Sequence, residues 1–477
     1  MASRPNIILF LADDHAPWTL PCYGHSEVRA PTFDGMARDG VVFENAFTPT
    51  PVCSPGRACL LTGLTSSQHG VHDFICMWDP ECQDRYWLAG SVTLAEMLQR
   101  EGYLCGLSGK WHIGRCSEAP RGYEWYFGFP LIGAHIGTSV YVDQGKAVAL
   151  KGNRTAITTD RAIDFIRTAP EDRPFFLQVG YTTTHSPHMG HDPELVASYR
   201  DATFKDIRVD EAHPLRWNEG LPDDTPDDED AIRVRHMNHY AGVTDVDQNV
   251  GRILEAVDLS GRAENTVVVY TSDHGLSLGQ NGFWGKGNGT RPLNMYDVSI
   301  RVPLLMTGPG LLGGHRVDRS VDHFDTFLAI CEFCGVEPGK YSADAAYPGR
   351  SCLPMAQGEH IGDWNDARFG EYGDLRMVRT PQYKLVKRYP NGLDDLFDLE
   401  ADPEEMVNVI DWTDLADVRA NLERDLDAFY ARYEDSEKSG LRVKELPRHN
   451  CTQRPGQKAS AEAWRDGIRE SRGLQIY

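Results

Sequence analysis

The sequence is poor in basic side chains, with 48 Lys and Arg against 70 Asp and Glu in 477 residues and a formal net charge of −22. An acidic surface repels nucleic-acid phosphates and anionic lipid, so we expect neither a nucleic acid nor a membrane surface as a partner. No apolar run approaches the roughly 18 residues that cross a bilayer, which excludes a membrane-spanning helix. An anionic substrate would therefore need a local cationic pocket.

The sequence also lacks a disulfide pattern and a recognisable leader. Its 11 cysteines are odd in number and irregularly spaced, unlike the frameworks of disulfide-rich secreted domains. The chain opens Met-Ala-Ser-Arg-Pro and enters an apolar run at 6–12, without the basic start, long apolar stretch and cleavage site of a signal peptide. We expect a cytoplasmic protein; the alternative is a leader that has been removed.

Short apolar runs alternate with amphipathic stretches over most of the chain. The runs predict buried strands at 6–12, 103–107, 175–179, 266–271 and 302–306. Apolar residues spaced by three and four, followed by Gly261, predict a helix over about 236–258. This alternation predicts an α/β fold in which helices sandwich a large, mostly parallel mixed sheet.

The texture changes past about residue 360. Short strands are expected at 369–372, 377–379, 384–387 and 395–399, followed by a helix with apolar residues between 415 and 429. We therefore predict a large domain over 1–360 and a smaller C-terminal α+β domain over 361–477 with a short antiparallel sheet. Its polar tail from about Ser436 either contacts another subunit or is disordered. The acidic stretch 218–230 is predicted to be a surface loop.

Polar side chains directly follow four of the predicted strands. They are Asp13 and Asp14, Lys110 and His112, His185 and His188, and Asp273 and His274. Ligands of open α/β sheets bind beyond the carboxyl ends of the strands, so we expect these groups to share one crevice. Three carboxylates there would repel one another without a cation, and their oxygens favour Ca²⁺ or Mg²⁺. The imidazole of His274 suits Mn²⁺ or Zn²⁺ better, which leaves the metal open.

A cysteine stands at the start of a short predicted helix in the stretch 51–63. Ser54 is expected to be the N-cap, Pro55 lies in the first turn and Gly63 ends the helix. Cys53 then lies at the helix N-terminus, where free N–H groups and the macrodipole favour an anion. A thiolate phosphatase would need a longer spacing to Arg57 than the three residues present. Other cysteines are expected to pack in the core, namely Cys59, Cys331 and Cys334.

The motif Cys53-Ser-Pro-Gly-Arg57 resembles the Cys-x-Pro-x-Arg signature of the sulfatases of the alkaline phosphatase superfamily. Further matching segments extend over most of the first 310 residues: Asn6–Asp14, Lys110–Gly114, Thr184–Pro187, Thr271–Gly275, Gly285–Gly287 and Arg301–Leu304. The stretch Leu396–Pro403 resembles the family's C-terminal domain. The resemblance implies an alkaline-phosphatase-like fold, with the catalytic sulfatase domain over 1–360.

In that family a separate maturation enzyme oxidises the cysteine to formylglycine, whose hydrate is the nucleophile. The resemblance implies this modification at Cys53, and it implies one divalent metal, Ca²⁺ first and Mn²⁺ or Mg²⁺ as alternatives. The implied metal ligands are residue 53 and Asp13, Asp14, Asp273 and His274. The implied catalytic groups beside residue 53 are Arg57, Lys110, His112, His185 and Lys286.

The resemblance also assigns a role to each of these catalytic groups. Arg57 and Lys110 orient the nucleophile. His112 removes its second hydroxyl proton, so that the sulfated hemiacetal expels sulfate. His185 and Lys286 contact the sulfate and the leaving oxygen, and one of them acts as the acid. Cations around a transferring anion neutralise charge where it develops, which fits this arrangement.

His274 departs from the commoner family pattern, in which asparagine follows the metal-binding aspartate. An Asp-His pair also resembles the phosphonate monoester and phosphodiester hydrolases of the superfamily, so that activity stays an alternative to sulfate ester hydrolysis. A non-catalytic binding protein on the same scaffold is a third hypothesis, and a homo-oligomer stays open. We expect a small-molecule or oligosaccharide sulfate ester, preferably a carbohydrate sulfate. Candidates to bind it are His69, His72, Asp73, His135 and Arg291.

Overall fold

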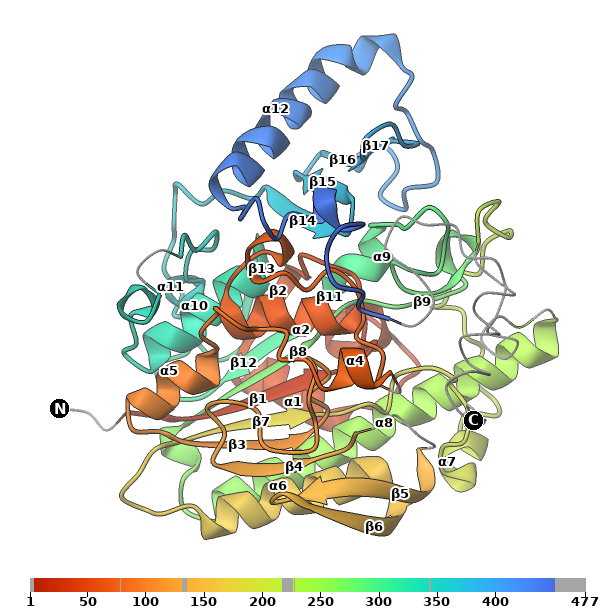
Figure 1. The fold of residues 1–477 in the computed structure, drawn as a ribbon. Helices are drawn as coiled ribbons and strands as arrows, with labels where there is room; N and C mark the ends of the chain where they lie inside the picture. The colour runs from red at the N-terminus through yellow and green to blue at the C-terminus, as the bar shows by residue number, and fades with distance from the viewer. Residues whose placement is uncertain are drawn as a thin grey trace.

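A computed structural model describes residues 4–77, 79–130, 135–216, 226, 228–342 and 345–450 of the chain. Within them, an 11-stranded sheet forms the centre of the molecule (Figure 1). Its strands run in the order β11 (Arg301–Val302), β2 (Val41–Phe47), β12 (Leu304–Thr307), β8 (Thr266–Ser272), β1 (Asn6–Ala12), β7 (Phe175–Gly180), β3 (Leu104–Gly109), β4 (Trp125–Gly128), β5 (Ile136–Asp143) and β6 (Lys146–Asn153). The remaining strand, β13 (His315–Asp322), pairs with β2.

The centre of this sheet is parallel and its margins are mixed. Neighbouring strands pair in parallel from β8 through β1, β7 and β3 to β4. Antiparallel pairs join β12 to β8 on one side and β5 to β4 on the other. The large, mostly parallel mixed sheet is therefore confirmed. The strand predicted at 302–306 is split into β11 and β12 at Pro303, which has no amide hydrogen to give to a ladder.

Helices cover both faces of the sheet, and the alternation along β1 shows why. Ile7 and Leu9 join one core with residues of α2 (Cys53–Thr62), α5 (Leu94–Arg100) and α10 (His323–Phe333). Ile8 and Phe10 join the other with residues of α1 (Pro31–Asp39), α6 (Arg154–Thr168) and α8 (Glu229–Leu259). Because successive side chains of a strand point to opposite faces, a continuously apolar strand supplies both cores.

The long helix α8 begins earlier than its apolar pattern predicts. Asp228 is its N-cap and accepts a hydrogen bond from the amide of Ala231 at 2.7 Å, and Glu229 and Asp230 lie in the first turn. Acidic side chains stabilise a helix N-terminus, so the end of the acidic stretch is helical rather than loop. Most of that stretch, 218–225 and residue 227, lies outside the described residues.

The C-terminal part of the chain forms the short antiparallel sheet that the sequence predicts. Its strands are β14 (Arg368–Tyr372), β15 (Leu375–Arg379), β16 (Tyr383–Arg388) and β17 (Asp395–Asp398). One face packs against α12 (Ala416–Arg432), at the top of Figure 1. The other packs against Val52 and Met295 of the large domain, next to the start of α2. The domain boundary near residue 360 stays a prediction.

The predicted polar tail is described as far as Asn450. Residues 435–450, here called the C-terminal strap, return to the large domain and hydrogen-bond to the loop that follows α2. The rest of the tail, 451–477, lies outside the described residues. No helix in the described part of the chain is long and apolar enough to span a membrane. The shorter elements are α3 (Ser66–His69), α4 (Pro80–Gln83), α7 (Pro193–Ala197), α9 (Asp297–Ile300), α11 (Leu353–Ala356), β9 (Ser277–Leu278) and β10 (Trp284–Gly285).

Candidate functional site

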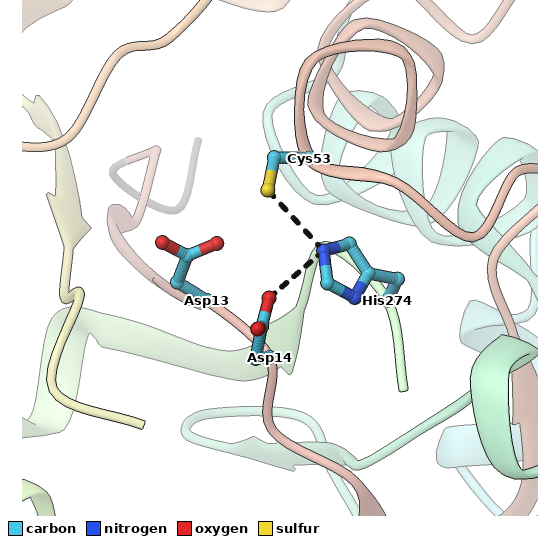
Figure 2. A group of neighbouring side chains, drawn as sticks. All are labelled: Asp13, Asp14, Cys53 and His274. Atoms are coloured by element: carbon cyan, nitrogen blue, oxygen red, sulfur yellow. Dashed lines mark hydrogen bonds and ion pairs between the residues drawn. The ribbon is translucent and has the colours of Figure 1, made fainter. Parts of the chain in front are cut away.

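The polar groups that follow the strands meet at one edge of the sheet, as predicted. Asp13 and Asp14 follow β1, Lys110 follows β3 and Asp273 follows β8. One potential ligand atom from each of Asp13, Asp14, Cys53 and His274 lies within 4.8 Å of the others, and all four residues are buried (Figure 2). The segments are distant in sequence, and the parallel order of their strands brings them together.

The donor atoms of this cluster suit a divalent cation. His274 Nε2 lies 3.1 Å from Asp14 Oδ1 and 3.4 Å from Cys53 Sγ. Asp273 Oδ1 lies 3.4 Å from the same nitrogen. Asp13 Oδ1 is buried without a hydrogen-bond partner among the described residues. Carboxylate oxygens with one imidazole form a donor set for a hard or borderline divalent ion.

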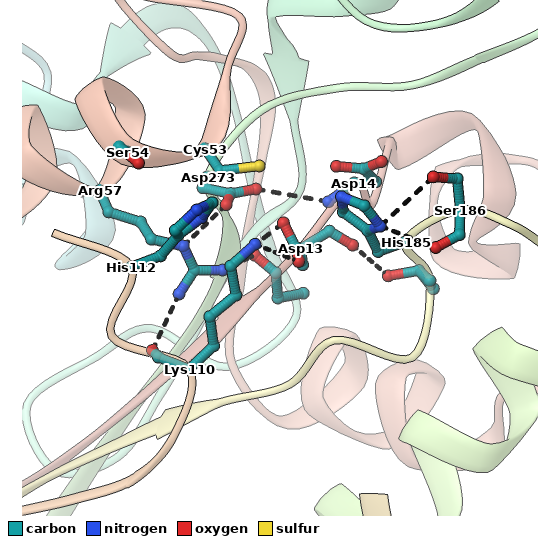
Figure 3. A network of polar contacts seen from close by, with 12 residues as sticks. Asp13, Asp14, Cys53, Ser54, Arg57, Lys110, His112, His185, Ser186 and Asp273 are labelled. Carbon is teal, nitrogen blue, oxygen red and sulfur yellow. Dashed lines mark hydrogen bonds and ion pairs between the residues drawn. The ribbon is translucent and has the colours of Figure 1, made fainter. Parts of the chain in front are cut away.

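Three cationic side chains lie against these carboxylates (Figure 3 shows two of them). Lys110 Nζ donates to Asp13 Oδ2 at 2.5 Å, and Arg57 Nε donates to Asp273 Oδ2 at 2.8 Å. Lys286 Nζ donates to Asp14 Oδ1 at 2.6 Å and to Cys53 Sγ at 3.1 Å. These three cations offset the charge of the three carboxylates, so the pocket can accept an anionic group despite the acidic surface of the protein.

The same cations act on the thiol of Cys53. Burial acts to raise the pKa of this thiol, but Lys110, Lys286 and His274 together hold it well below its usual value. Cys53 is the first residue of α2, where the helix dipole also favours an anion. Position 53 is therefore an anionic, reactive position in the chain.

Two histidines near Cys53 have opposite pKa shifts. Burial and the neighbouring Lys110 lower the pKa of His112 to about 4, so its imidazole is neutral. Burial also acts to lower the pKa of His185, but Asp14, Asp13 and Cys53 together outweigh it and the pKa rises to about 9. At neutral pH the site therefore offers one basic imidazole and one acidic imidazolium.

The start of α2 differs from the sequence prediction in one detail. Val52, not Ser54, is the N-cap, and its side chain makes no capping bond. The Ser54 hydroxyl instead accepts a hydrogen bond from the amide of Ile75 at 2.9 Å, because the loop after α2 folds back over the helix start. Gly63 ends the helix as predicted, with a φ of 69° and its amide bonded to the carbonyl of Cys59 at 2.9 Å.

The cysteines expected in the core are buried there. Cys59 lies on α2, with its sulfur 3.4 Å from Nε2 of His69. Cys331 and Cys334 lie in the apolar core on and after α10. Burial raises the pKa of each of these thiols, so they are less reactive than Cys53. None of the described cysteines forms a disulfide.

Two candidate substrate-binding residues are held by distant segments. His72 Nε2 lies 2.6 Å from the carbonyl oxygen of Lys438 in the C-terminal strap. Asp73 accepts hydrogen bonds from the Tyr372 hydroxyl at 2.7 Å and from the Asn450 side chain at 2.8 Å. Burial raises the pKa of Asp73 to about 6. A role for His72 and Asp73 in binding substrate stays a prediction.

Of the other three candidates, His69 lies on α3 against the sulfur of Cys59, and His135 and Arg291 lie on different segments. His135 precedes β5 and stacks on His191, with ring centroids 4.3 Å apart. Arg291 follows Lys286 in the chain and donates to the carbonyl of Asn288 at 2.9 Å. Asp73 and Tyr372 are among the groups that act on the pKa of Arg291, so it lies near the Asp73 network. A substrate contact by His135 or Arg291 also stays a prediction.

Sequence reasoning missed several residues around the site. Tyr372 reaches Asp73 from β14, and His449 and Asn450 reach the loop after α2 from the C-terminal strap. No motif marks these residues, and they lie about three hundred or more positions from their partners. Only the tertiary packing brings them to the site.

The mixed α/β sheet with its small C-terminal antiparallel sheet is a fold that the chain shares with the solved structures described below. The sulfatase family model matches residues 5–336, which is more than half of the chain, and a model described as N-sulphoglucosamine sulphohydrolase, C-terminal, matches residues 290–432. The chain belongs to the sulfatase family, and it is an enzyme of that family.

Relatives and solved structures agree with this assignment. The chain is 26% identical to an N-acetylglucosamine-6-O-sulfatase of Bacteroides thetaiotaomicron, over 91% of this chain and 88% of that protein. It is 28% identical to an ulvan-active sulfatase of Formosa agariphila, over 92% and 83%. A solved structure in complex with its substrate D-glucosamine-2-N,6-O-disulfate has a TM-score of 0.76 at 23% identity, over 91% of this chain and 99% of that one. The phosphonate monoester hydrolase of Agrobacterium radiobacter has a TM-score of 0.71 at 22% identity, over 90% and 96%.

Proposed function

We propose that the protein hydrolyses a sulfate ester carried by a carbohydrate and releases sulfate and the alcohol. The observation that carries the proposal is Cys53 at the start of α2, against buried carboxylates and cations from the ends of the strands. Support for a carbohydrate comes from the relatives, whose names refer to N-acetylglucosamine and ulvan.

A divalent cation fits this site because Asp13 Oδ1 has no hydrogen-bond partner among the described residues and the neighbouring donors are carboxylate oxygens, one imidazole and residue 53. The proposed ligands are residue 53 and Asp13, Asp14, Asp273 and His274. The oxygen-rich set favours Ca²⁺, with Mn²⁺ or Mg²⁺ as alternatives. When bound, the ion would neutralise negative charge on the transferring group.

Residue 53 is proposed to carry formylglycine, made from Cys53 by a separate maturation enzyme. When present, its hydrated aldehyde supplies the nucleophilic oxygen. Arg57 and Lys110 are proposed to orient this group, since they already hold the carboxylates beside it. Cationic groups that are already in place stabilise developing charge without reorganisation.

The two histidines with opposite pKa shifts are proposed to be the base and the acid. His112 donates from Nε2 to the carbonyl of Ile75 at 3.0 Å, which leaves Nδ1 free to take a proton from residue 53. His185 donates from Nδ1 to the carbonyl of Ser186 at 2.8 Å, and as an imidazolium it can give its other proton to the leaving oxygen. Lys286 is proposed to contact the sulfate.

A phosphonate monoester or phosphodiester hydrolase is the second candidate. The observation that favours it is the imidazole of His274 among the metal-ligand candidates. A non-catalytic binding protein is the weaker alternative, because every charged group that the family motif demands is in place at the site.

The test begins with protein co-expressed with the maturation enzyme. The mass of the peptide that contains residue 53 should be lower by the difference between a thiol and an aldehyde. The protein should also hydrolyse aryl sulfates and sulfated sugars. Cys53→Ala should abolish turnover and leave the melting temperature unchanged. A higher kcat/KM on an aryl phosphonate than on the matched aryl sulfate would select the second candidate. No turnover of either ester by fully converted protein would select the binding protein.

A further inference from the structure

The C-terminal strap is attached to the segment that follows α2, which contains α3 and the loop 70–77. The amide of Asp435 donates to the carbonyl of Ser67 at 3.1 Å, and the amide of Gly440 donates to the Ser67 hydroxyl at 3.0 Å. Lys438 Nζ donates to the carbonyl of Gln68 at 3.0 Å. These bonds bring the last described residues onto the loop 70–77.

His449 holds this loop through its ring and its backbone. Its Nε2 accepts a hydrogen bond from the amide of His72 at 3.0 Å and lies 3.3 Å from the carbonyl oxygen of Gly70. The shorter contact, to the amide, assigns Nε2 as the acceptor. The carbonyl oxygen of His449 accepts a hydrogen bond from the amide of Cys76 at 2.8 Å. Its ring stacks on Trp87, with centroids 4.3 Å apart. Burial lowers the pKa of His449 to about 3, so the ring is neutral and Nε2 keeps the lone pair that the His72 amide needs.

The two amides that His449 binds lie on either side of Ile75. The amide of Ile75 donates to the Ser54 hydroxyl at 2.9 Å, and its carbonyl oxygen accepts a hydrogen bond from Nε2 of His112 at 3.0 Å. The Ile75 carbonyl is therefore held from both sides of the loop. His449 lies at one end of this hydrogen-bond relay and His112 at the other.

The Ile75 carbonyl decides which nitrogen of His112 carries the proton. A carbonyl oxygen accepts only, so Nε2 must be protonated, and the lone pair of the neutral ring is then on Nδ1. His112 Nδ1 is buried and meets no hydrogen-bond partner of good geometry among the described residues. Cys53 is close enough to act on the pKa of this ring, so residue 53 is a second group that bears on the tautomer besides the Ile75 carbonyl. If the Ile75 carbonyl were displaced, neither the tautomer nor the orientation of the His112 ring would be fixed.

We propose that His449 is a positioning residue for His112: by holding the loop at His72 and Cys76, it keeps the Ile75 carbonyl where it sets the tautomer and orientation of His112. This inference rests on the proposed function for its effect on turnover. The residue comes from a part of the chain outside the predicted catalytic domain, so the C-terminal strap completes the catalytic site from a distance.

Two substitutions separate the hydrogen bond from the packing. His449→Phe keeps a ring to stack on Trp87 and removes the acceptor for the His72 amide. His449→Gln keeps an acceptor at nearly the same distance from the backbone. Arg442→Ala is the matched control, because among the described residues the half-exposed side chain of Arg442 bonds to Ser436, Glu437 and Glu445, all within the strap itself.

The first measurement is made on the unmatured full chain, without turnover. Ring ¹⁵N shifts of selectively labelled histidines should show His112 protonated on Nε2 and His449 protonated on Nδ1 in the wild type. In His449→Phe the His112 signals should shift toward a mixture of tautomers, and His449→Gln should restore them. A wild-type His112 protonated on Nδ1, or a wild-type His449 protonated on Nε2, would overturn the proposal even if His449→Phe did not fold.

The second measurement is turnover by the matured protein. His449→Phe should lower kcat about ten- to a hundredfold with KM changed less than about twofold, and His449→Gln should recover most of the loss. A lower kcat with an unchanged His112 spectrum would assign His449 a merely structural role and overturn the proposal. If matured wild type hydrolysed no sulfate ester, the proposed function would fail, and the ring spectra would still decide whether His449 positions His112.

Discussion

Replacing Lys384 by methionine should weaken the attachment of the C-terminal sheet to the large domain. Lys384 lies on β16 and is fully buried, with Nζ 2.6 Å from Asp297 Oδ1 and 2.5 Å from Glu405 Oε1. The same nitrogen donates to the carbonyl of Met295 at 2.9 Å. Asp297 and Met295 belong to the segment that continues from Lys286, so Lys384 ties the sheet to the segment that carries Lys286.

The loss in unfolding free energy depends on the buried charges that remain after Lys384 is removed. Removing one partner of a buried ion pair costs about 3–5 kcal/mol, because the other charge is left uncompensated. Asp297 keeps the guanidinium of Arg379, with Nη2 2.8 Å from Oδ2. Among the described residues, Glu405 keeps the hydrogen bond from the amide of Asp297, at 2.5 Å, and the more distant charge of Arg379. Methionine matches the length of the lysine stem, so the loss comes from the charge on Glu405 rather than from a cavity.

The stability lost in Lys384→Met should be larger at high pH than at low pH. Burial raises the pKa of Glu405 to about 7 although Lys384 opposes the shift, so loss of Lys384 raises it further. A carboxyl with a raised pKa binds its proton more tightly in the folded state. Its contribution is full below the unfolded pKa and is lost as pH rises through the folded one. The deficit of Lys384→Met should therefore be largest near about pH 8 and should shrink toward about pH 5, where Glu405 is protonated.

The assay is urea unfolding of the full chain as a double-mutant cycle of Lys384→Met and Glu405→Gln. The double variant should recover most of the stability that Lys384→Met loses, since no buried charge is then left unpaired. A loss below about 1 kcal/mol at the higher pH, the range of a surface pair, would refute the reasoning. A double variant no more stable than Lys384→Met would refute it as well.

Three further predictions concern the site and its supports. Burial raises the pKa of Asp73 to about 6, so its stabilisation is full below about pH 4 and lost as pH rises through 6. The difference in unfolding free energy between wild type and Asp73→Asn should thus change by up to about 3 kcal/mol over that range; a pH-independent difference would contradict the shift. Chelation should lower the melting temperature, and added Ca²⁺ should restore it. At a hundredfold excess over Kd the ion should add about 2.7 kcal/mol to the free energy of unfolding. An unchanged melting curve would argue against a bound metal. Gly63→Ala should cost at least about 1 kcal/mol in urea unfolding, because φ is 69° and the added Cβ would lie 2.3 Å from Phe327 Cδ1. If Gly63→Ala were as stable as the wild type, this prediction would be wrong, because α2 and α10 could then move apart at no cost.

Much of the candidate site could be predicted because the signal is local. Asp13 and Asp273 each follow a buried apolar strand directly, and parallel strands deliver the residues at their carboxyl ends to the same edge. Cys53 stands at a helix start that Pro55 and Gly63 mark in the sequence. These inferences need only the neighbours of each residue and one rule of sheet geometry.

The details that could not be predicted depend on partners far away in the chain. Ser54 has the side chain of an N-cap, but its hydroxyl binds the amide of Ile75 instead. The helix α8 begins at an acidic cap that composition alone assigns to a loop. A short polar side chain has several possible partners of similar energy, and tertiary packing decides among them.

By itself, the sequence determined the α/β class, the family and the residues that gather at the strand ends, because each depends on local patterns of apolar and polar residues. Only the tertiary structure decided how those residues pair. It placed Lys286 between Asp14 and Cys53, and it gave His112 and His185 opposite protonation. It also brought His449 to the loop behind His112. Charge interactions and burial act through space, so they exist only once the chain has folded.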